Sequence, residues 1–235
     1  MRIAAFSLAV ALALSFLATR ALAAEMVVIE SNAPSLREGT VVDSTKEVTV
    51  PAGAKITLMA ASGEKTKIEG PFTGKPPASA KAGDPRLMTA VARLFDPQAK
   101  DTTALGAFRG RKGASLVGPD AIDAVRGGNF CVLQNMQPRL RRGLPGQMPE
   151  WGKLTAIKEG VDGDVAWAAG MTLADWPAAV PIAEGARYML SRARAQPVRI
   201  VLHVEPKGLS LAARLEWMLE RGCREQAVLL VDQLP

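Results

Sequence analysis

The chain has 235 residues, of which 48% are hydrophobic and 5% aromatic, and its 29 basic and 23 acidic residues give a net charge of +6. The hydrophobic content is high enough for a folded core, which excludes a wholly disordered chain. The mild charge and the scarcity of aromatic rings argue against nucleic-acid binding, because that function needs a strongly basic surface and rings on which bases stack. We therefore expect a globular protein of one or two domains with no nucleic-acid partner.

Residues 1–24 have the pattern of a cleavable export signal. Arg2 gives a positive start, Ile3 to Leu17 is an apolar run, and Ala21-Leu22-Ala23 offers a small-x-small cleavage site. The run is too short for a transmembrane helix, and no later segment approaches that length. We expect a periplasmic or secreted protein with no stable membrane insertion once the signal is removed.

Residues 25–74 predict a small antiparallel β-module. Along Ala54–Ala60 the side chains of Ile56 and Leu58 fall on one face and those of Lys55 and Thr57 on the other, the period of a half-buried strand. Further strands are expected at Met26–Ile29, Glu47–Val50 and Lys65–Glu69, with turns at Pro51-Ala52-Gly53 and Ser62-Gly63.

A resemblance runs through the same region. It consists of Leu36-x-x-Gly39, Val48-x-Val50-Pro51-Ala52-Gly53-Ala54, Ile56-x-Leu58, Ser62-Gly63 and Ile68-x-Gly70-Pro71. This succession resembles the periplasmic β-domain of FecR-like iron-citrate regulators. The family's inner-membrane helix and cytoplasmic anti-sigma segment are not expected here. The resemblance implies a binding or signalling-accessory module rather than an enzyme.

Residues 75–83 are expected to form a linker, and residues 84–128 a connector made of one helix and one basic loop. Asp84 is a good N-cap, and Pro85 fits the first helical position. The apolar stripe of the helix, which indicates an ordinary amphipathic helix, is Leu87, Val91, Leu94 and Phe95.

The basic loop is the glycine-rich stretch Gly106–Gly113, which contains Arg109, Arg111 and Lys112. Glycines let backbone N–H groups approach an anion. The spacing does not match a P-loop, because Lys112 is followed by glycine and not by serine or threonine. The two hypotheses are a flexible basic loop and a contact of these three side chains with an anion or a partner.

Residues 129–235 predict a β-sandwich-like domain with C-terminal helices. Strands are expected at Phe130–Leu133, Leu154–Lys158 and Asp164–Ala168, with a turn at Val161-Asp162-Gly163-Asp164. The spacing of certain residues is similar to that in immunoglobulin-like and fibronectin-like modules, in which a buried Trp and a late Tyr pin facing sheets. These residues are Trp167, Trp176-Pro177, Pro181-Ile182, Gly185 and Tyr188. Generic anchors of another β fold, or an exposed Trp/Pro surface that binds glycans, are the alternatives.

The only histidine of the chain, His203, lies in the expected strand Val198–Glu205. A single histidine cannot build a multi-histidine zinc site, and no complete catalytic motif accompanies it. We expect a solvent-facing histidine; the alternative is a general base that works with a nearby acid such as Glu205. No metal, cofactor or catalytic residue is predicted.

Two helices are expected at the C-terminal end, with apolar faces over Leu209–Leu219 and Ala227–Val231 and a break at Gly222. Cys223 at their junction and Cys131 are the only cysteines. In an oxidising compartment such a pair favours a structural disulfide, with two free buried thiols as the alternative. The bond would tie the helices to the strand that carries Cys131.

The sequence thus predicts a mainly β protein of the α+β class. The leading hypothesis for its function is a non-enzymatic interaction or scaffold module that binds an envelope protein or another component of the cell envelope. One alternative is a periplasmic hydrolase that uses His203. The other is a protein that binds a small apolar ligand between its two domains.

Overall fold

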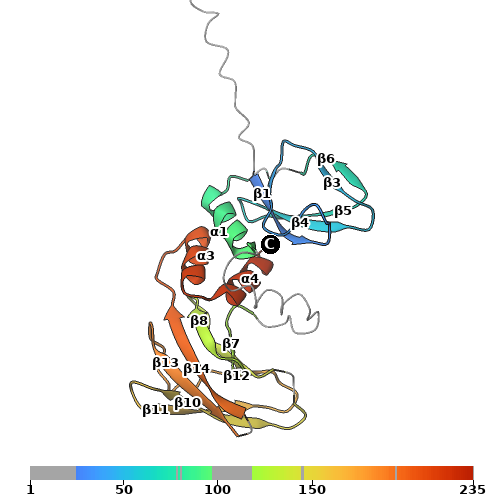
Figure 1. The fold of residues 1–235 in the computed structure, drawn as a ribbon. Helices are drawn as coiled ribbons and strands as arrows, with labels where there is room; N and C mark the ends of the chain where they lie inside the picture. The colour runs from blue at the N-terminus through green and yellow to red at the C-terminus, as the bar shows by residue number, and fades with distance from the viewer. Residues whose placement is uncertain are drawn as a thin grey trace, which may run out of the picture.

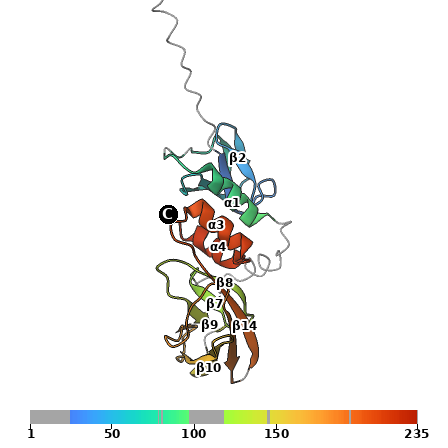
Figure 2. The same cartoon turned by 90° about the vertical axis from the view of Figure 1, so that its left-hand side faces the viewer.

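The protein consists of two β units separated by a layer of helices. The computed structural model describes residues 25–77, 79, 81–96, 118–143, 146–193 and 195–234. Figures 1 and 2 show the helices between the small N-terminal β unit and the larger C-terminal sandwich in both views. The predicted fold class, mainly β with helices and a C-terminal helix pair, is confirmed.

The N-terminal unit contains an antiparallel sheet and a separate two-stranded ribbon. Its core is closed by aliphatic side chains that include Val28, Val50 and Leu58. The sheet has the order β2-β1-β4-β5, and β3 pairs with β6. The strands are β1 (Glu25–Ser31), β2 (Val41–Asp43), β3 (Val48–Val50), β4 (Lys55–Ala60), β5 (Lys65–Glu69) and β6 (Phe72–Gly74).

The central strands of this sheet are buried on both faces, although the alternation in β4 predicted half-buried strands. Thr57 and Met59, on the face expected to meet solvent, are 5% and 0% exposed. Thr57 donates a hydrogen bond to Glu30 Oε2 over 2.8 Å, which satisfies its buried hydroxyl. The prediction of a solvated second face was wrong because helices from distant parts of the chain cover it.

The described residues form three helices: α1 (Pro85–Phe95), α3 (Leu211–Glu220) and α4 (Arg224–Asp232). Asp84 caps α1 by accepting a hydrogen bond from the backbone N–H of Arg86, as predicted. Gly222 turns the chain between α3 and α4 at a φ of +75°, a left-handed conformation that favours glycine.

The helices share one hydrophobic core with the N-terminal sheet. This core joins Val27 and Ile29 of β1 to Leu94 of α1, Leu215 of α3 and Val231 of α4. Lys65 on β5 also donates a hydrogen bond to the carbonyl of Asp232 over 2.8 Å. The helix pair therefore packs on the first unit. The predicted division into connector and second domain stays a prediction.

The sandwich pairs a five-stranded sheet of order β11-β10-β13-β14-β8 with a three-stranded sheet of order β12-β9-β7. Most neighbours are antiparallel, but β14 runs parallel to β8, and β7 parallel to β9. The strands of the larger sheet are β8 (Gly128–Val132), β10 (Glu150–Ala156), β11 (Val161–Trp167), β13 (Arg187–Arg192) and β14 (Ala195–Val204). Those of the smaller sheet are β7 (Ala121–Asp123), β9 (Arg139–Arg141) and β12 (Leu173–Asp175).

Large aromatic side chains fill the core of the sandwich. Trp167 and Tyr188 are each 0% exposed, and the indole N–H of Trp167 donates to the carbonyl of Leu140 on the opposite sheet over 2.8 Å. Trp176 meets Tyr188 edge-to-face, with 4.9 Å between ring centroids. Trp167 and Trp176 are thus anchors of the core, so these two residues do not form the exposed Trp surface that was the alternative.

One turn of the sandwich lies earlier than predicted. Val161–Asp164 belongs to β11, and the chain reverses at residues 157–160, where Gly160 has a φ of +66°. Gly163 serves a different purpose, because a Cβ added there would lie 2.5 Å from the Pro177 side chain. The glycine marks a close approach inside a strand and not a turn.

A disulfide joins the sandwich to the helical layer. Cys131 on β8 and Cys223 before α4 are bonded, with their Cα atoms 5.8 Å apart. Beside them the Gln226 side chain hydrogen-bonds to the edge of β8, as the backbone of a neighbouring strand would. Its amide oxygen accepts from the N–H of Cys131 over 2.7 Å, and its amide nitrogen donates to the carbonyl of Cys131 over 3.0 Å. Within the described ranges, no helix has the length and apolar character needed to span a membrane.

Candidate interaction site

The most exposed large hydrophobic side chains of the described residues gather at one end of the sandwich. They are Met148, Trp151 and Met171, which are 75%, 62% and 54% exposed. Trp151 lies on β10, and Leu154 of the same strand faces the core, because it is 0% exposed. Trp151 therefore projects away from the core, since successive strand residues point to opposite faces. We name this group the apolar end.

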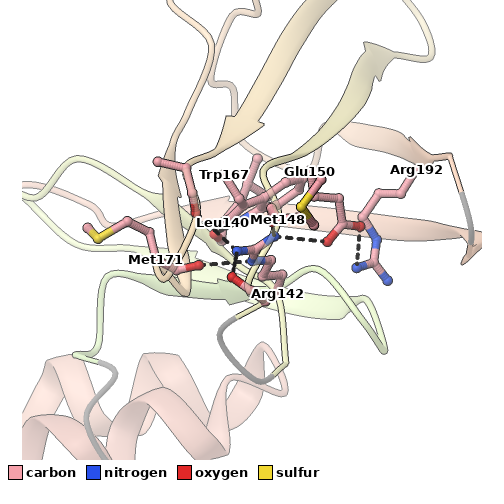
Figure 3. A network of polar contacts seen from close by, with 9 residues as sticks. Leu140, Arg142, Met148, Glu150, Trp167, Met171 and Arg192 are labelled. Atoms are coloured by element: carbon pink, nitrogen blue, oxygen red, sulfur yellow. Dashed lines mark hydrogen bonds and ion pairs between the residues drawn. The ribbon is translucent and has the colours of Figure 1, made fainter.

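A buried arginine fixes the two loops from which the methionines project. The Arg142 side chain is 4% exposed and donates hydrogen bonds to backbone carbonyls of both loops. On one loop it reaches Gly146 and Met148, and on the other Ala168 and Met171, over 2.9 to 3.3 Å. Figure 3 shows the guanidinium between these loops.

Additional bonds strengthen the same arrangement. The N–H of Gly170 donates to the carbonyl of Gly146 over 2.8 Å, which joins the two loops directly. Glu150 lies 3.5 Å from Arg142 and 3.3 Å from Arg192, so one carboxylate compensates two nearly buried guanidinium groups (Figure 3). Because breaking such a pair leaves a buried charge, these contacts hold the loops in one conformation.

His203 contacts Glu184 and Asn129, with 3.4 Å from Nδ1 to Glu184 Oε1 and 3.3 Å from Nε2 to Asn129 Oδ1. Its side chain is 13% exposed, so it is more buried than the predicted solvent-facing histidine. Among the described residues no hydroxyl group hydrogen-bonds to it.

The acid that the sequence suggested for His203 is engaged elsewhere. Glu205 follows the end of β14, and its side chain, 1% exposed, accepts from Arg214 over 2.5 Å. It also accepts from the backbone N–H of Gln134 over 2.8 Å. The pairing of His203 with Glu205 was wrong, because Glu205 has turned towards α3. The hydrolase hypothesis as such stays a prediction.

The remaining candidate residues of the sequence are the two cysteines and the three basic residues of the glycine-rich loop. Cys131 and Cys223, predicted as a structural pair, are bonded to each other. Arg109, Arg111 and Lys112 lie outside the described residues. In the part of the chain that the structure describes, no cluster of three or more His, Cys, Asp or Glu side chains could hold a metal ion.

Sequence reasoning missed the apolar end. Arg142 belongs to the run Arg139-Leu140-Arg141-Arg142, which has the composition of an ordinary charged surface. A signal for Trp151 was available, since it lies out of phase with Leu154 and Ala156 on a strand of period two. No family model, no curated protein and no solved structure matches this chain.

Proposed function

We propose that this protein is an exported, non-enzymatic interaction module that binds a partner protein of the cell envelope through the apolar end of its sandwich. The observation that carries the proposal is the grouping of Met148, Trp151 and Met171, all more than half exposed. Met148 and Met171 project from loops fixed by Arg142, and Trp151 lies on the adjoining strand β10. Single exposed apolar side chains are normal on a protein surface. Three together on one ordered part of the structure suit a binding surface.

The chemistry of these side chains fits protein recognition. Trp and Met are enriched in interface cores, where Trp supplies a large rigid contact area and Met adapts to irregular shapes. The Arg142 contacts reduce the entropy that the loops would lose on binding, because the loops are already ordered. Catalysis has less support, since the His203 contacts supply neither a nucleophile nor the expected acid.

Export is supported by two independent observations. The first 24 residues have the composition of a signal, and the structure contains a Cys131–Cys223 disulfide. Disulfides persist in oxidising compartments and are rare in reducing cytosol. Fractionation of cells that express the C-terminally tagged protein tests this part. A periplasmic or secreted product whose N-terminus begins after Ala23 or Ala24 is expected, and a cytoplasmic full-length product would refute it.

The binding surface is tested by site-specific photo-crosslinking in intact cells. A photoreactive residue at position 151 is expected to capture one envelope protein, identified by mass spectrometry. The control is position 41 in the N-terminal unit, where Val41 is 48% exposed and lies on the edge strand β2. Equal capture of the same protein from both positions, or of nothing specific from position 151, would overturn the proposal.

A variant separates binding from folding. Replacing Met148, Trp151 and Met171 together by Ser should abolish capture of the partner protein by a tagged form of this chain. Because all three are largely exposed, the free energy of unfolding should change by no more than about 0.5 kcal/mol for each substitution. The matched control Val41→Ser should keep the captured partner. Retention of that partner by the triple variant would place the interface elsewhere.

A further inference from the structure

The outer face of the five-stranded sheet carries a row of side chains with opposite charges at its two ends. The register pairs Asp162 on β11 with Thr155 on β10, Thr155 with Met189 on β13, and Met189 with Arg199 on β14. We name these four residues the central row. It therefore reads acid, hydroxyl, thioether and guanidinium across four adjacent strands.

All members of the central row point away from the sandwich core. Their sequence neighbours Leu154, Leu190 and Ile200 are each 0% exposed, and side chains alternate along a strand. Asp162 has a side chain 47% exposed, and Arg199 is exposed with no ion-pair partner among the described residues. The row is accessible at both charged ends.

The neighbours of Asp162 within its own copy do not neutralise its charge completely. Asp162 accepts from the Thr155 hydroxyl over 2.7 Å and lies 3.6 Å from Lys153, whose side chain is 58% exposed. An exposed pair of this kind contributes only about 0–1 kcal/mol and leaves the carboxylate open to a second cation. The Thr155 hydrogen bond, followed by the charge of Lys153, lowers the pKa of Asp162 and keeps it ionised in neutral and mildly acidic solution.

We propose that two copies of this chain associate through this outer face, with a two-fold axis parallel to the strands between β10 and β13. A rotation about that axis exchanges β11 with β14 and β10 with β13. It places Asp162 of each copy opposite Arg199 of the other, and Thr155 opposite Met189. A surface that matches itself in this way is the requirement for an isologous dimer.

The neighbouring rows are compatible with the same axis. Lys153 pairs with Ser191 across β10 and β13, so each Lys153 meets a serine of the second copy. On the other side the N–H of Ile157 bonds to the carbonyl of Arg187, so each Arg187 meets an isoleucine. In neither row does a basic side chain stand directly opposite another. The symmetry-related copies of Lys153 and of Arg187 lie diagonally across the axis, where like charges weaken the contact.

The size of the face sets the expected strength. Strands lie about 4.8 Å apart, so four strands span roughly 14 Å between the outer two. Because packed sheets twist, only the rows near the axis stay in register. The contact belongs to the small interfaces, below about 1,200 Å² in total, which are typical of weak association. A reversible dimer with salt-sensitive affinity follows, since its specific contacts are exposed charges.

The axis also has a geometric consequence for the proposed partner site. Rotation about an axis parallel to the strands leaves each position along the strand unchanged. The apolar ends of both copies therefore lie at the same end of the dimer.

Sedimentation equilibrium of the purified, oxidised mature chain tests the dimer, with charge reversal in the central row. Asp162→Arg and Arg199→Glu each set like charges against each other and should raise the dimer Kd at least about tenfold. The double variant restores opposite charges with reversed polarity and should return the Kd to within about threefold of the starting value. Lys75→Glu, an exposed charge reversal of the same size in the N-terminal unit, is the control and should change nothing.

Three results would overturn the dimer: a monomer at the highest soluble concentration, single variants that dimerise normally, or a double variant as weak as the single ones. If the dimer is lost in the Arg199→Glu variant but not in the Asp162→Arg variant, a different, acidic partner occupies the face. That result would also contradict the two-fold arrangement. The measurement uses the protein by itself. Its outcome is therefore independent of whether crosslinking at position 151 captures an envelope protein.

Discussion

The two β units of this protein close their hydrophobic cores in different ways. Among the described residues, those of the sandwich core come from one stretch of the chain, from Ile122 to Leu202. The N-terminal sheet has one face closed by its own residues, whereas its other face is covered by α1 and by the last two helices of the chain. The sandwich can therefore keep its core without its neighbours, but the first unit depends on segments far away in the sequence.

The largest effect on this comparison should come from removing the disulfide, which joins strand β8 of the sandwich to the helical layer of the shared core. Replacing Cys131 and Cys223 together by Ser opens a loop with a sequence separation of 92. The chain-entropy estimate for such a loop gives a loss of about 4–5 kcal/mol in the free energy of unfolding, as an upper value. Urea unfolding followed by circular dichroism measures the loss, and thiol titration of the unreduced parent protein should find no free thiol. A change below about 1 kcal/mol would show that the helices stay docked without the bond.

A matched pair of cavity variants sharpens the comparison. Leu215 in the shared core and Leu154 in the sandwich core are both 0% exposed, and Leu→Ala at either position should cost about 2–5 kcal/mol. Hydrogen exchange should separate them. Leu215→Ala should accelerate exchange in β1 and β4, while Leu154→Ala should affect the sandwich and leave those strands protected. Similar exchange profiles would mean that the two cores unfold as one unit.

A smaller effect is expected at Gln226, the side chain that pairs with the edge of β8. Gln226→Leu removes the partners of the N–H and carbonyl of Cys131 and of the carbonyl of Pro119. A buried backbone group without a partner costs about 1–3 kcal/mol, and three such groups lose theirs here, so the variant should lose at least roughly 2 kcal/mol. The control Gln233→Leu changes an exposed residue and should be nearly neutral. Thermal denaturation compares the two; equal melting temperatures would contradict the role of Gln226.

The smallest effect concerns acid stability at Asp123 on β7. Burial raises the pKa of its carboxyl. Hydrogen bonds from the backbone N–H groups of Val125 and Arg126 and from the Arg126 side chain, together with the charge of Arg141, outweigh burial and lower this pKa below its usual range. A lowered pKa gives stability that is complete above the unfolded value and is lost as the pH falls through the folded value. Asp123→Asn should be less stable near neutral pH and should lose less on acidification. The urea denaturation midpoints of the two proteins, measured from neutral to acidic pH, test this prediction. If the two midpoints fall in parallel as the pH is lowered, the stabilising role of the Asp123 carboxylate is contradicted.

Features that depend on residues close together in the sequence could be predicted, whereas features that depend on residues far apart in the sequence could not. The cap at Asp84, the break at Gly222 and most strands were predicted correctly, because turn chemistry and alternation act over a few residues. The disulfide was predicted because only two cysteines were available. Burial of Thr57 and the position of α4 could not be predicted, since both result from packing between distant segments.

The candidate site follows the same rule. The outward direction of Trp151 could be read from the period of β10. The burial of Arg142 could not, because the carbonyls that surround it come from residues 146–148 and 168–171. Nothing in the local sequence distinguishes this arginine from its solvated neighbours.

The shared core has a consequence for the order in which the chain can fold. β1 is the first described strand to be synthesised and α4 the last helix, yet Val27 and Val231 belong to the same core. During synthesis the back of the first sheet stays uncovered until almost the whole chain is available. The unit that is made first is therefore completed last, and its apolar surface stays exposed until then, the condition under which partly folded chains aggregate. Such long-range closure also predicts slow final folding, because segments about 200 residues apart must meet before the core is sealed.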